Sequence, residues 1–516
     1  MTPTNRILLN TSATYTRALV SLLLGLFSVR WVLAALGKSD FGLFGVVGGI
    51  VVLVQLLNIV MSNAVSRCYA YAIGETERGM PTDRVYDFMK GWFNAAVSIH
   101  FVLPILLVAV GYPIGIWTIG NWLVIPPERI SACYWVFRLV LIGSFASMIS
   151  VPYIAMFNAW QLIAEVTCWD LIRSVLLFFG ALLLMHLQCD RLVAYAFIMT
   201  ISPIAIMSIL VSRARKRFPY CRIDPNLLFN WEKLKIVGTF GLSDMFSSFG
   251  VVARDHGATF IINKLFGPIV NSAYSIANQL SAQANTLANS MQGALMPAVT
   301  TLEGAGKHQR AILLSHRSCK FCSLLVLLFA IPLFAEVDEV LRLWLVNPPQ
   351  YASSLCRCVL ASMVCAKLGL GYHLSILAKG KVMKYQFTLG MISYLTLPIM
   401  YVLAIYQGVV GIGYALIANS IMLSVTRVTY AHFLVNVSIA FWFFKIVLPI
   451  FFVIALSGAL CLIPTFIFEQ SFMRICFTSC LLIFSLASLS YAFVLDSEER
   501  KFIVEKIWAA KRRLFN

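Results

Sequence analysis

The sequence predicts an all-α polytopic membrane protein with about fourteen transmembrane helices, and three observations support this class. The 516 residues are 60% hydrophobic and 12% charged, with a mean hydropathy of +0.84. A soluble domain cannot bury so much apolar surface. Long apolar runs recur along the chain, and its positive charges gather in alternate breaks between them.

The apolar runs define the predicted spans. A helix needs roughly 20 residues to cross the hydrocarbon core of a bilayer. Runs of about this length lie at 13–35, 43–66, 91–117, 132–157, 162–186, 192–212, 236–261, 271–298, 320–344, 353–377, 386–406, 411–434, 444–467 and 475–495.

Lysine and arginine determine the predicted orientation. With the N-terminus in the cytoplasm, the inside segments hold about 26 of the 40 Lys and Arg residues and the outside loops about six. We therefore predict that both termini are cytoplasmic. The net charge of +18 needs no nucleic-acid partner, because basic loops of this kind set topology and contact membrane lipid head groups.

Two halves of the chain carry matching motifs in the same order. The matches are WLVIPP (122–127) with WLVNPP (344–349), Arg138 with Arg357, Tyr153 with Tyr372, and Phe-Gly at 41–42 with Phe-Gly at 266–267. The repeat has about six spans, and an even number of spans predicts two parallel lobes. We place the lobes at 1–212 and 236–434, joined by a basic linker at 213–235, with two further helices and a basic tail at 435–516.

The predicted eighth span, 271–298, carries many amide and hydroxyl side chains. On a helix, one face gathers Asn278, Asn285, Asn289 and Gln292, and the opposite face is apolar. Amides that face hydrocarbon cost several kcal/mol each. Two interpretations remain open: the amides join packed helices, or they line an aqueous cavity. The width of the polar face favours the cavity.

Basic residues outnumber acidic ones within the predicted spans. Arg17 and Arg357 lie near span ends and can snorkel, and Asp170 is spaced to pair with Arg173. The other cations, each costing about 2.5–3.5 kcal/mol at the bilayer centre, are Arg30, Arg138, Arg254, Lys367 and Arg427.

This surplus of cations predicts a net-positive cavity. Asp255 follows Arg254 in the sequence, but the helical twist directs the two side chains about 100° apart. We therefore expect Asp255 not to neutralise Arg254. Such a cavity would bind an anionic substrate, with arginine side chains holding its phosphate oxygens.

Catalytic signatures are missing from the sequence. The segment EGAGKHQR (303–310) lacks the first glycine and the final Ser or Thr of a phosphate-binding loop. The seven histidines do not cluster, and the single pair of Cys319 and Cys322 is a weak metal signal. We therefore predict a protein that is not an enzyme and uses no metal or other cofactor.

Four stretches of the sequence carry a family resemblance. They are LGKSDFGLFGVVGGI (36–50), NWLVIPPERISACYWVF (121–137), SVPYIAMFNAW (150–160) and FGPIVNSAYSIANQLSAQANTLANSMQGALMPAVT (266–300). Together they resemble the multidrug/oligosaccharidyl-lipid/polysaccharide (MOP) exporter superfamily, and within it the Wzx-type polysaccharide flippases. The chain departs from that group at MFNAWQLIAE, where related chains often carry a charged run.

The resemblance implies a function and a location. It implies alternating access in the bacterial inner membrane, with a cargo of O-antigen or capsule repeat units on undecaprenyl pyrophosphate. In related lipid II flippases the last two helices hold the lipid tail, which suggests that role for 444–495. The implied partners are the lipid-linked oligosaccharide, membrane lipids and a glycan polymerase, and the implied state is a monomer.

Other functions stay open. A cation-coupled multidrug antiporter of the same superfamily would need buried carboxylates, for which Asp244 and Asp255 are the candidates. Asp255 and Asp170 are also the candidates for coupling to H⁺ or Na⁺. A membrane scaffold for glycan assembly is a third possibility.

Overall fold

The computed structural model describes most of the chain as helices. The described residues are 3–50, 61–62, 65–66, 68–69, 73, 82–160, 162–304, 306–379, 383–469, 471–501 and 505, and they contain no strand. Ten of the described helices are long and apolar enough to cross a membrane, or eleven if one bent pair counts as a span. The predicted class, an all-α multi-pass membrane protein, is confirmed. The predicted second span, 43–66, lies partly outside the described residues.

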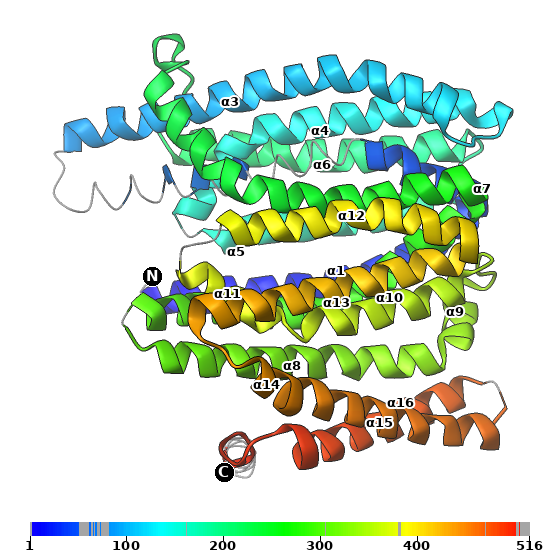
Figure 1. Ribbon diagram of the computed structural model, residues 1–516. Helices are drawn as coiled ribbons and strands as arrows, with labels where there is room; N and C mark the ends of the chain where they lie inside the picture. The colour runs from blue at the N-terminus through cyan, green and yellow to red at the C-terminus, as the bar shows by residue number, and fades with distance from the viewer. Residues whose placement is uncertain are drawn as a thin grey trace, which may run out of the picture. The chain divides into compact units, whose positions relative to one another are not determined.

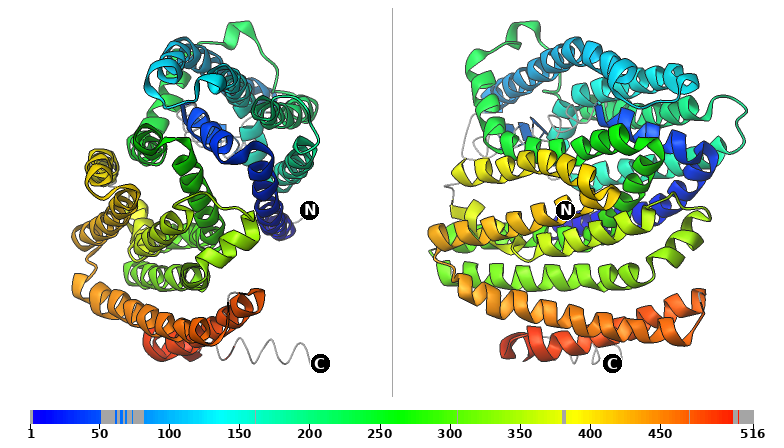
Figure 2. Two further views of the ribbon diagram at one scale, coloured as in Figure 1. Left: turned by 90° about the vertical axis from the view of Figure 1, so that its right-hand side faces the viewer. Right: turned by 45° about the vertical axis from the view of Figure 1, so that its right-hand side comes forward.

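Figures 1 and 2 show the described helices in their order along the chain. They are α1 (Pro3–Ile50), α3 (Thr82–Trp117), α4 (Ile130–Ala159), α5 (Ile163–Leu184), α6 (Arg191–Arg217), α7 (Trp231–Gly304), α8 (His308–Ala335), α9 (Val337–Leu345), α10 (Ala352–Lys367), α11 (Leu370–Lys379), α12 (Met383–Gln407), α13 (Val409–Val435), α14 (Ile439–Trp442), α15 (Leu448–Ile467) and α16 (Phe472–Leu489). Single π-helical turns follow α3, α14 and α16, at Thr118–Trp122, Phe443–Val447 and Ser490–Val494.

Helices α1 and α7 are each divided by a glycine kink. Gly37 has φ 76° and ψ 170°, and Gly267 has φ 81° and ψ −178°. Other residues rarely adopt these angles. The 74 residues of α7 would extend about 110 Å as one straight helix, so the kink is needed to separate the predicted seventh and eighth spans. The sequence comparison matched Gly42 with Gly267. The backbone angles instead identify Gly37 as the counterpart of Gly267, because both glycines have positive φ at a kink.

The chain divides into two compact units. Unit 1 comprises Met1–Ser275 with Ser393–Tyr401, and unit 2 comprises Ile276–Ile392 with Val402–Asn516. These units are defined by compactness and divide within α7. The lobes and linker inferred from the sequence are defined by repetition, and they stay a prediction.

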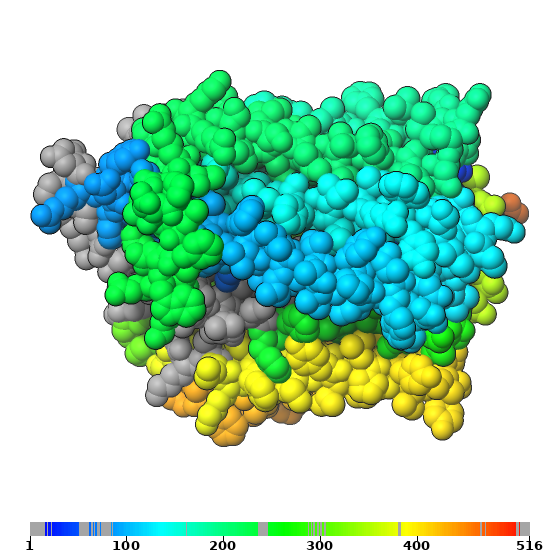
Figure 3. Space-filling view, turned by 90° about the horizontal axis from the view of Figure 1, so that it is seen from above, coloured from blue at the N-terminus to red at the C-terminus, as the bar shows by residue number. Residues whose placement is uncertain are grey.

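In unit 1, α4 is the central helix. It packs along α3 and α6, while α5 packs along α1. Figure 3 shows the side chains of α3, α4 and α6 packed together on one face. The apolar core between these helices includes Phe137 and Met148 of α4. At one end of α4, Arg129 forms ion pairs with Asp40 and Asp190, which tie α1, α4 and α6 together.

The segment between α6 and α7 docks on α3 through a buried asparagine. The side chain of Asn94 accepts a hydrogen bond from the backbone N–H of Asp224 at 2.8 Å and donates one to the Arg222 carbonyl at 3.1 Å. The carboxylate of Asp224 also accepts a hydrogen bond from Lys90 at 2.6 Å, which lowers the pKa of Asp224. The backbone N–H of Asp224 and the carbonyl of Arg222 lie outside any helix, and the Asn94 side chain supplies the partners that they need.

In unit 2, α8 lies at the centre of the packing. Helices α10, α11, α15 and α16 all pack on it, and α10 also pairs closely with α13. The last two long helices, α15 and α16, run side by side (Figure 2). A buried ion pair joins α16 to the start of α9: Arg474 lies 2.6 Å from Glu336, whose other oxygen accepts a hydrogen bond from Thr478.

We predict that Glu336→Ala destabilises the protein far more than Asp338→Ala. Glu336 is 1% exposed, and its loss leaves Arg474 with an uncompensated buried charge, at a cost of about 3–5 kcal/mol. Asp338 is 58% exposed and pairs with Arg357 at the surface, an interaction that contributes about 0–1 kcal/mol. Thermal unfolding of the purified variants in one detergent measures the difference. Equal unfolding midpoints would show that the buried pair does not dock α16.

Candidate functional site

A break between α10 and α11 forms the centre of the candidate site in unit 2. The two helices are bent by 42° at this break. The last carbonyls of a helix have no partner within it, and here side chains of α13 and α14 take that place. The hydrogen bonds are Ser424 to Cys365 (2.7 Å), Arg427 to Ala366 (3.0 Å) and Trp442 to Leu368 (2.9 Å).

Two glycines allow the broken segment to pack tightly between α8 and α13. A Cβ atom on Gly369 would lie 2.7 Å from the carbonyl oxygen of Ser424. A Cβ on Gly371 would overlap the carbonyl oxygen of Ser315 in α8. Both neighbours are backbone atoms, which cannot move aside as a flexible side chain can. The break is therefore held in place from two sides.

Lys367 and Arg427 lie at this break without a carboxylate partner among the described residues. Lys367 is 6% exposed, and its Nζ donates to Asn289 Oδ1 at 3.0 Å. Arg427 donates from Nη1 to the Ala366 carbonyl, while its buried Nε has no acceptor within the described part of the chain. The two positive charges repel one another. An anion beside both would offset this repulsion.

The polar face of α7 reaches this site through Asn289. Four residues earlier, Asn285 donates to the Ser281 carbonyl at 3.1 Å, and its own buried Oδ1 has no donor in the described structure. Asn278 and Gln292 are half-buried and form no hydrogen bond with another described residue. Of the four amides predicted to bind substrate, the structure thus brings Asn289 directly to a predicted cation.

Arg254, in unit 1, is paired with Asp255, and the expectation that Asp255 would not neutralise it is wrong. The guanidinium Nε and Nη2 lie 2.8 and 2.6 Å from Asp255 Oδ1. The helical twist separates the two Cα–Cβ bonds, but the long arginine side chain folds back across the turn between them. Asp255 is 46% exposed and Arg254 is 16% exposed, so the carboxylate is the more accessible partner of the pair.

The other two predicted cations, Arg30 and Arg138, also belong to unit 1. Arg138 donates to the Tyr112 hydroxyl at 3.3 Å, and its guanidinium lies 5.3 Å from the ring centre of Trp135. Both aromatic side chains are exposed, as is typical of rings at a membrane–water boundary. Arg30 is half-buried and has no hydrogen bond or ion pair with another described residue.

Asp170 is shared between two arginines. It lies 3.1 Å from Arg173, which confirms the predicted pair, and 3.2 Å from Arg17. Arg17 therefore forms an ion pair where the sequence suggested snorkelling. Asp244 was also a candidate carboxylate, but its side chain lies outside the described part of the structure.

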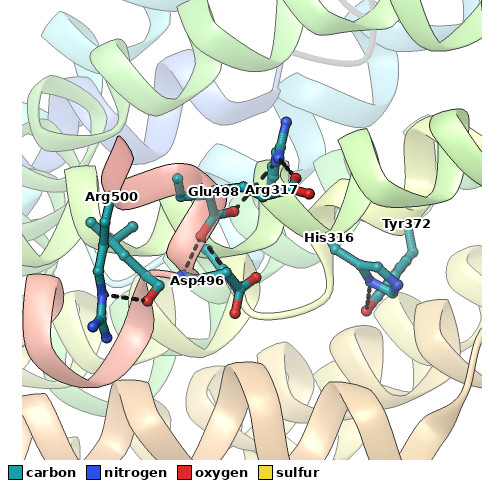
Figure 4. Close-up of polar contacts among 9 residues, drawn as sticks. His316, Arg317, Tyr372, Asp496, Glu498 and Arg500 are labelled. Carbon is teal, nitrogen blue, oxygen red and sulfur yellow. Dashed lines mark hydrogen bonds and ion pairs between the residues drawn. The ribbon is translucent and has the colours of Figure 1, made fainter. Parts of the chain in front are cut away.

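A second polar cluster joins α8 to the segment that follows α16 (Figure 4). Lys320 is 1% exposed, and its Nζ lies 2.6 Å from Asp496 and 3.3 Å from Glu499. Arg317 pairs with Glu498 at 3.2 Å, and His316 shares a hydrogen bond of 2.7 Å with the Tyr372 hydroxyl. Buried Lys320 is thus matched by two carboxylates, whereas buried Lys367 is matched by an amide oxygen.

Sequence reasoning found the two cations of the break but missed the groups that organise it. Ser424 and Trp442 have no distinguishing spacing, because their role depends on which helices lie beside α10. Gly369 and Gly371, in the run KLGLGYH, were a usable signal: paired glycines next to an intramembrane lysine indicate a break in the helix.

The fold matches solved transporter structures. No family model matches the sequence, and no curated protein is similar to it. An inward-facing multidrug resistance MATE family transporter of the MOP superfamily matches with a TM-score of 0.62 and 12% identity, over 82% of this chain and 94% of that one. The lipid II flippase MurJ, in an inward closed conformation, matches with a TM-score of 0.63 and 12% identity, over 94% and 98%.

A third match is a MOP superfamily transporter from Pyrococcus furiosus, described as having a binding pocket of reverse polarity. Its TM-score is 0.58 at 13% identity, over 84% of this chain and 94% of that one. At such identities the likeness shows the fold. The chain therefore has the polytopic helical fold of MOP superfamily transporters.

We predict that Gly371→Ala lowers stability while Gly458→Ala does not. The new methyl group at 371 would overlap backbone of α8, and overpacking of this kind costs typically about 1–3 kcal/mol. A Cβ on Gly458, in α15, meets no atom within 4 Å. Thermal unfolding in detergent compares the two variants with the parent chain. A Gly371→Ala variant as stable as Gly458→Ala would mean that α8 does not clamp the break.

Proposed function

We propose that the protein flips undecaprenyl-pyrophosphate-linked oligosaccharide repeat units across the bacterial inner membrane. One observation carries this proposal: Lys367 and Arg427 lie together at a helix break, with no carboxylate partner among the described residues. Intramembrane cations are costly, and they commonly mark the path of a substrate. Two uncompensated cations favour a cargo with a negative head group.

The chemistry of the site suits a pyrophosphate. Guanidinium and ammonium groups form strong charge-assisted hydrogen bonds with phosphate oxygens. Broken helices recur at the binding sites of membrane transporters, where their ends meet charged ligands. The neighbouring amides of Asn285 and Asn289 can donate to and accept from sugar hydroxyls. A head group with both phosphate and sugar would use all of these groups.

The match to the lipid II flippase covers more of this chain than the match to the MATE transporter, and this supports a lipid cargo. The match to the lipid II flippase covers 94% of this chain, so it must include most of residues 435–516. The match to the MATE transporter covers 82%. We propose that α15 and α16 hold the polyprenyl tail of the cargo, as the family resemblance of the sequence implies. O-antigen or capsule repeat units, a nearby glycan polymerase and a monomeric state belong to the same proposal.

The carboxylates argue against the drug antiporter. An organic cation needs a carboxylate that is free to receive it, yet Asp170 is held by two arginines and Asp255 by one. Asp255 is the more exposed of the two, and we keep both as candidates for ion coupling. Proton- or sodium-driven efflux of organic cations that requires Asp255 would instead support the antiporter.

We predict that Lys367→Ala and Arg427→Ala each weaken binding of undecaprenyl pyrophosphate at least tenfold. Each variant removes a charged donor, and a hydrogen bond to a charged group is worth about 1.5–3 kcal/mol. Titration of the lipid into the purified protein in nanodiscs measures the affinity. Cells that depend on the protein for surface glycan should also lose that glycan with either variant.

The matched control for these variants is Arg357→Ala. Arg357 lies on α10, as Lys367 does, and its removal changes the net charge equally, but it pairs with Asp338 at the surface. We expect this variant to bind the lipid as the parent chain does. Unchanged affinity in both site variants would refute the pyrophosphate site, and glycan export that tolerates both would refute the flippase.

A further inference from the structure

A groove between α4 and α6 in unit 1 plays no part in the proposed transport site. Its volume is about 560 Å³. Apolar side chains form its walls, namely Phe145, Ala146 and Ile149 from α4 and Ile204, Met207 and Val211 from α6. Both helices are candidate membrane spans, and these wall residues lie within them. Arg215 and Lys216 line the groove where α6 ends.

Of the four basic residues at the end of α6, two form ion pairs with described residues and two do not. Arg213 and Arg217 are one helical turn apart, and each lies 2.6 Å from an oxygen of Glu165 in α5. Arg215 and Lys216 have no carboxylate partner in the part of the chain that the structure describes. Glu165 is thus already held by two arginines. The positive charge that remains lies over the groove.

Arg215 is held in position at the mouth of the groove. Its Nη2 donates to the Tyr153 hydroxyl at 3.1 Å, and its guanidinium lies 5.4 Å from the centre of the Tyr153 ring. A side chain already fixed in this way loses less entropy when it binds a ligand. Its other N–H groups remain available for an anion, because a guanidinium carries five donors.

Two of the three serines that line the groove, Ser150 and Ser208, use their hydroxyl protons within their own helices. They donate to the Ser147 and Ile204 carbonyls, respectively. The groove extends along α6 from residue 204 to residue 216, about 18 Å at the rise of a helix. One leaflet of the hydrocarbon core is about 15 Å thick. The groove therefore matches a chain that crosses one leaflet and ends in an anionic group.

We propose that this groove binds one anionic phospholipid of the bilayer. Its acyl chain lies between α4 and α6, and its phosphate contacts Arg215 and Lys216. The apolar walls favour a lipid over free phosphate, because a free anion gains nothing from burial against hydrocarbon. The unpaired cations favour an anionic head group over a zwitterionic one.

Two double variants with the same change of charge test the head-group contact. Binding is measured by native mass spectrometry of the purified full chain, titrated with phosphatidylglycerol or with phosphatidylcholine of the same acyl chains. We expect the parent chain to bind phosphatidylglycerol at least tenfold more tightly. The R215A/K216A variant should lose this preference, and R213A/R217A should keep it. Equal loss in both variants would overturn the proposal, because general electrostatic attraction would then explain the preference.

The variant Ala146→Phe tests the acyl-chain contact without changing any charge. The added ring fills the groove, so phosphatidylglycerol binding should fall at least tenfold. Lys216→Glu provides a second test at the mouth and should reverse the preference between the two lipids. Gel filtration and thermal unfolding confirm that each variant is folded. Parent-like binding by Ala146→Phe would overturn the proposal.

Two competitors identify the source of the anion. Inorganic phosphate at the lipid's concentration should not displace phosphatidylglycerol, and undecaprenyl phosphate should not displace it preferentially. Displacement by either would overturn the assignment to a bilayer phospholipid. Lys367→Ala should leave phosphatidylglycerol binding unchanged, since this groove is independent of the proposed transport site.

Discussion

The constraint on which the structure depends is that a charge within the membrane must find a partner. Water is absent from the hydrocarbon core, so an intramembrane cation is stabilised when an anion, a polar group or a bound ligand lies beside it. The described part of unit 2 shows the different solutions side by side. Arg474 is matched by Glu336 and Lys320 by two carboxylates, whereas Lys367 and Arg427 have amide and carbonyl oxygens. This difference separates cations that hold the fold together from those that we propose receive a substrate.

The helix break shows how the fold creates an uncompensated charge. Interrupting α10 frees carbonyl groups, and side chains of α13 and α14 satisfy them. Arg427 is one of those side chains, so the contact that completes the broken helix also brings a second cation to Lys367. Gly369 and Gly371 permit the close approach on either side. The helix break and the proposed binding site therefore depend on the same few residues.

Much of this architecture could be predicted from the sequence, because hydrophobic runs and charge asymmetry are strong signals in a membrane protein. The class of fold, the polar face of α7 and the pair of Asp170 with Arg173 follow from spacing alone. The pairing of Arg254 with Asp255 did not, because helical geometry gives the direction of a Cβ atom and not the path of a long side chain. The sequence comparison missed Gly37 as the counterpart of Gly267, because the residues around the two glycines differ. Their backbone angles agree. Which cation receives a carboxylate depends on contacts between distant segments, which one sequence does not reveal.

The position of Lys320 has a consequence for biosynthesis. Its partner Asp496 follows 176 residues later in the chain. At about 5–20 residues per second, a ribosome needs roughly 9–35 s to make that stretch. During this interval α8 already exists, but its lysine has no counter-charge. Unit 2 can therefore reach its final packing only when translation is almost complete, and a chain that ends before residue 496 would leave Lys320 without its two carboxylate partners.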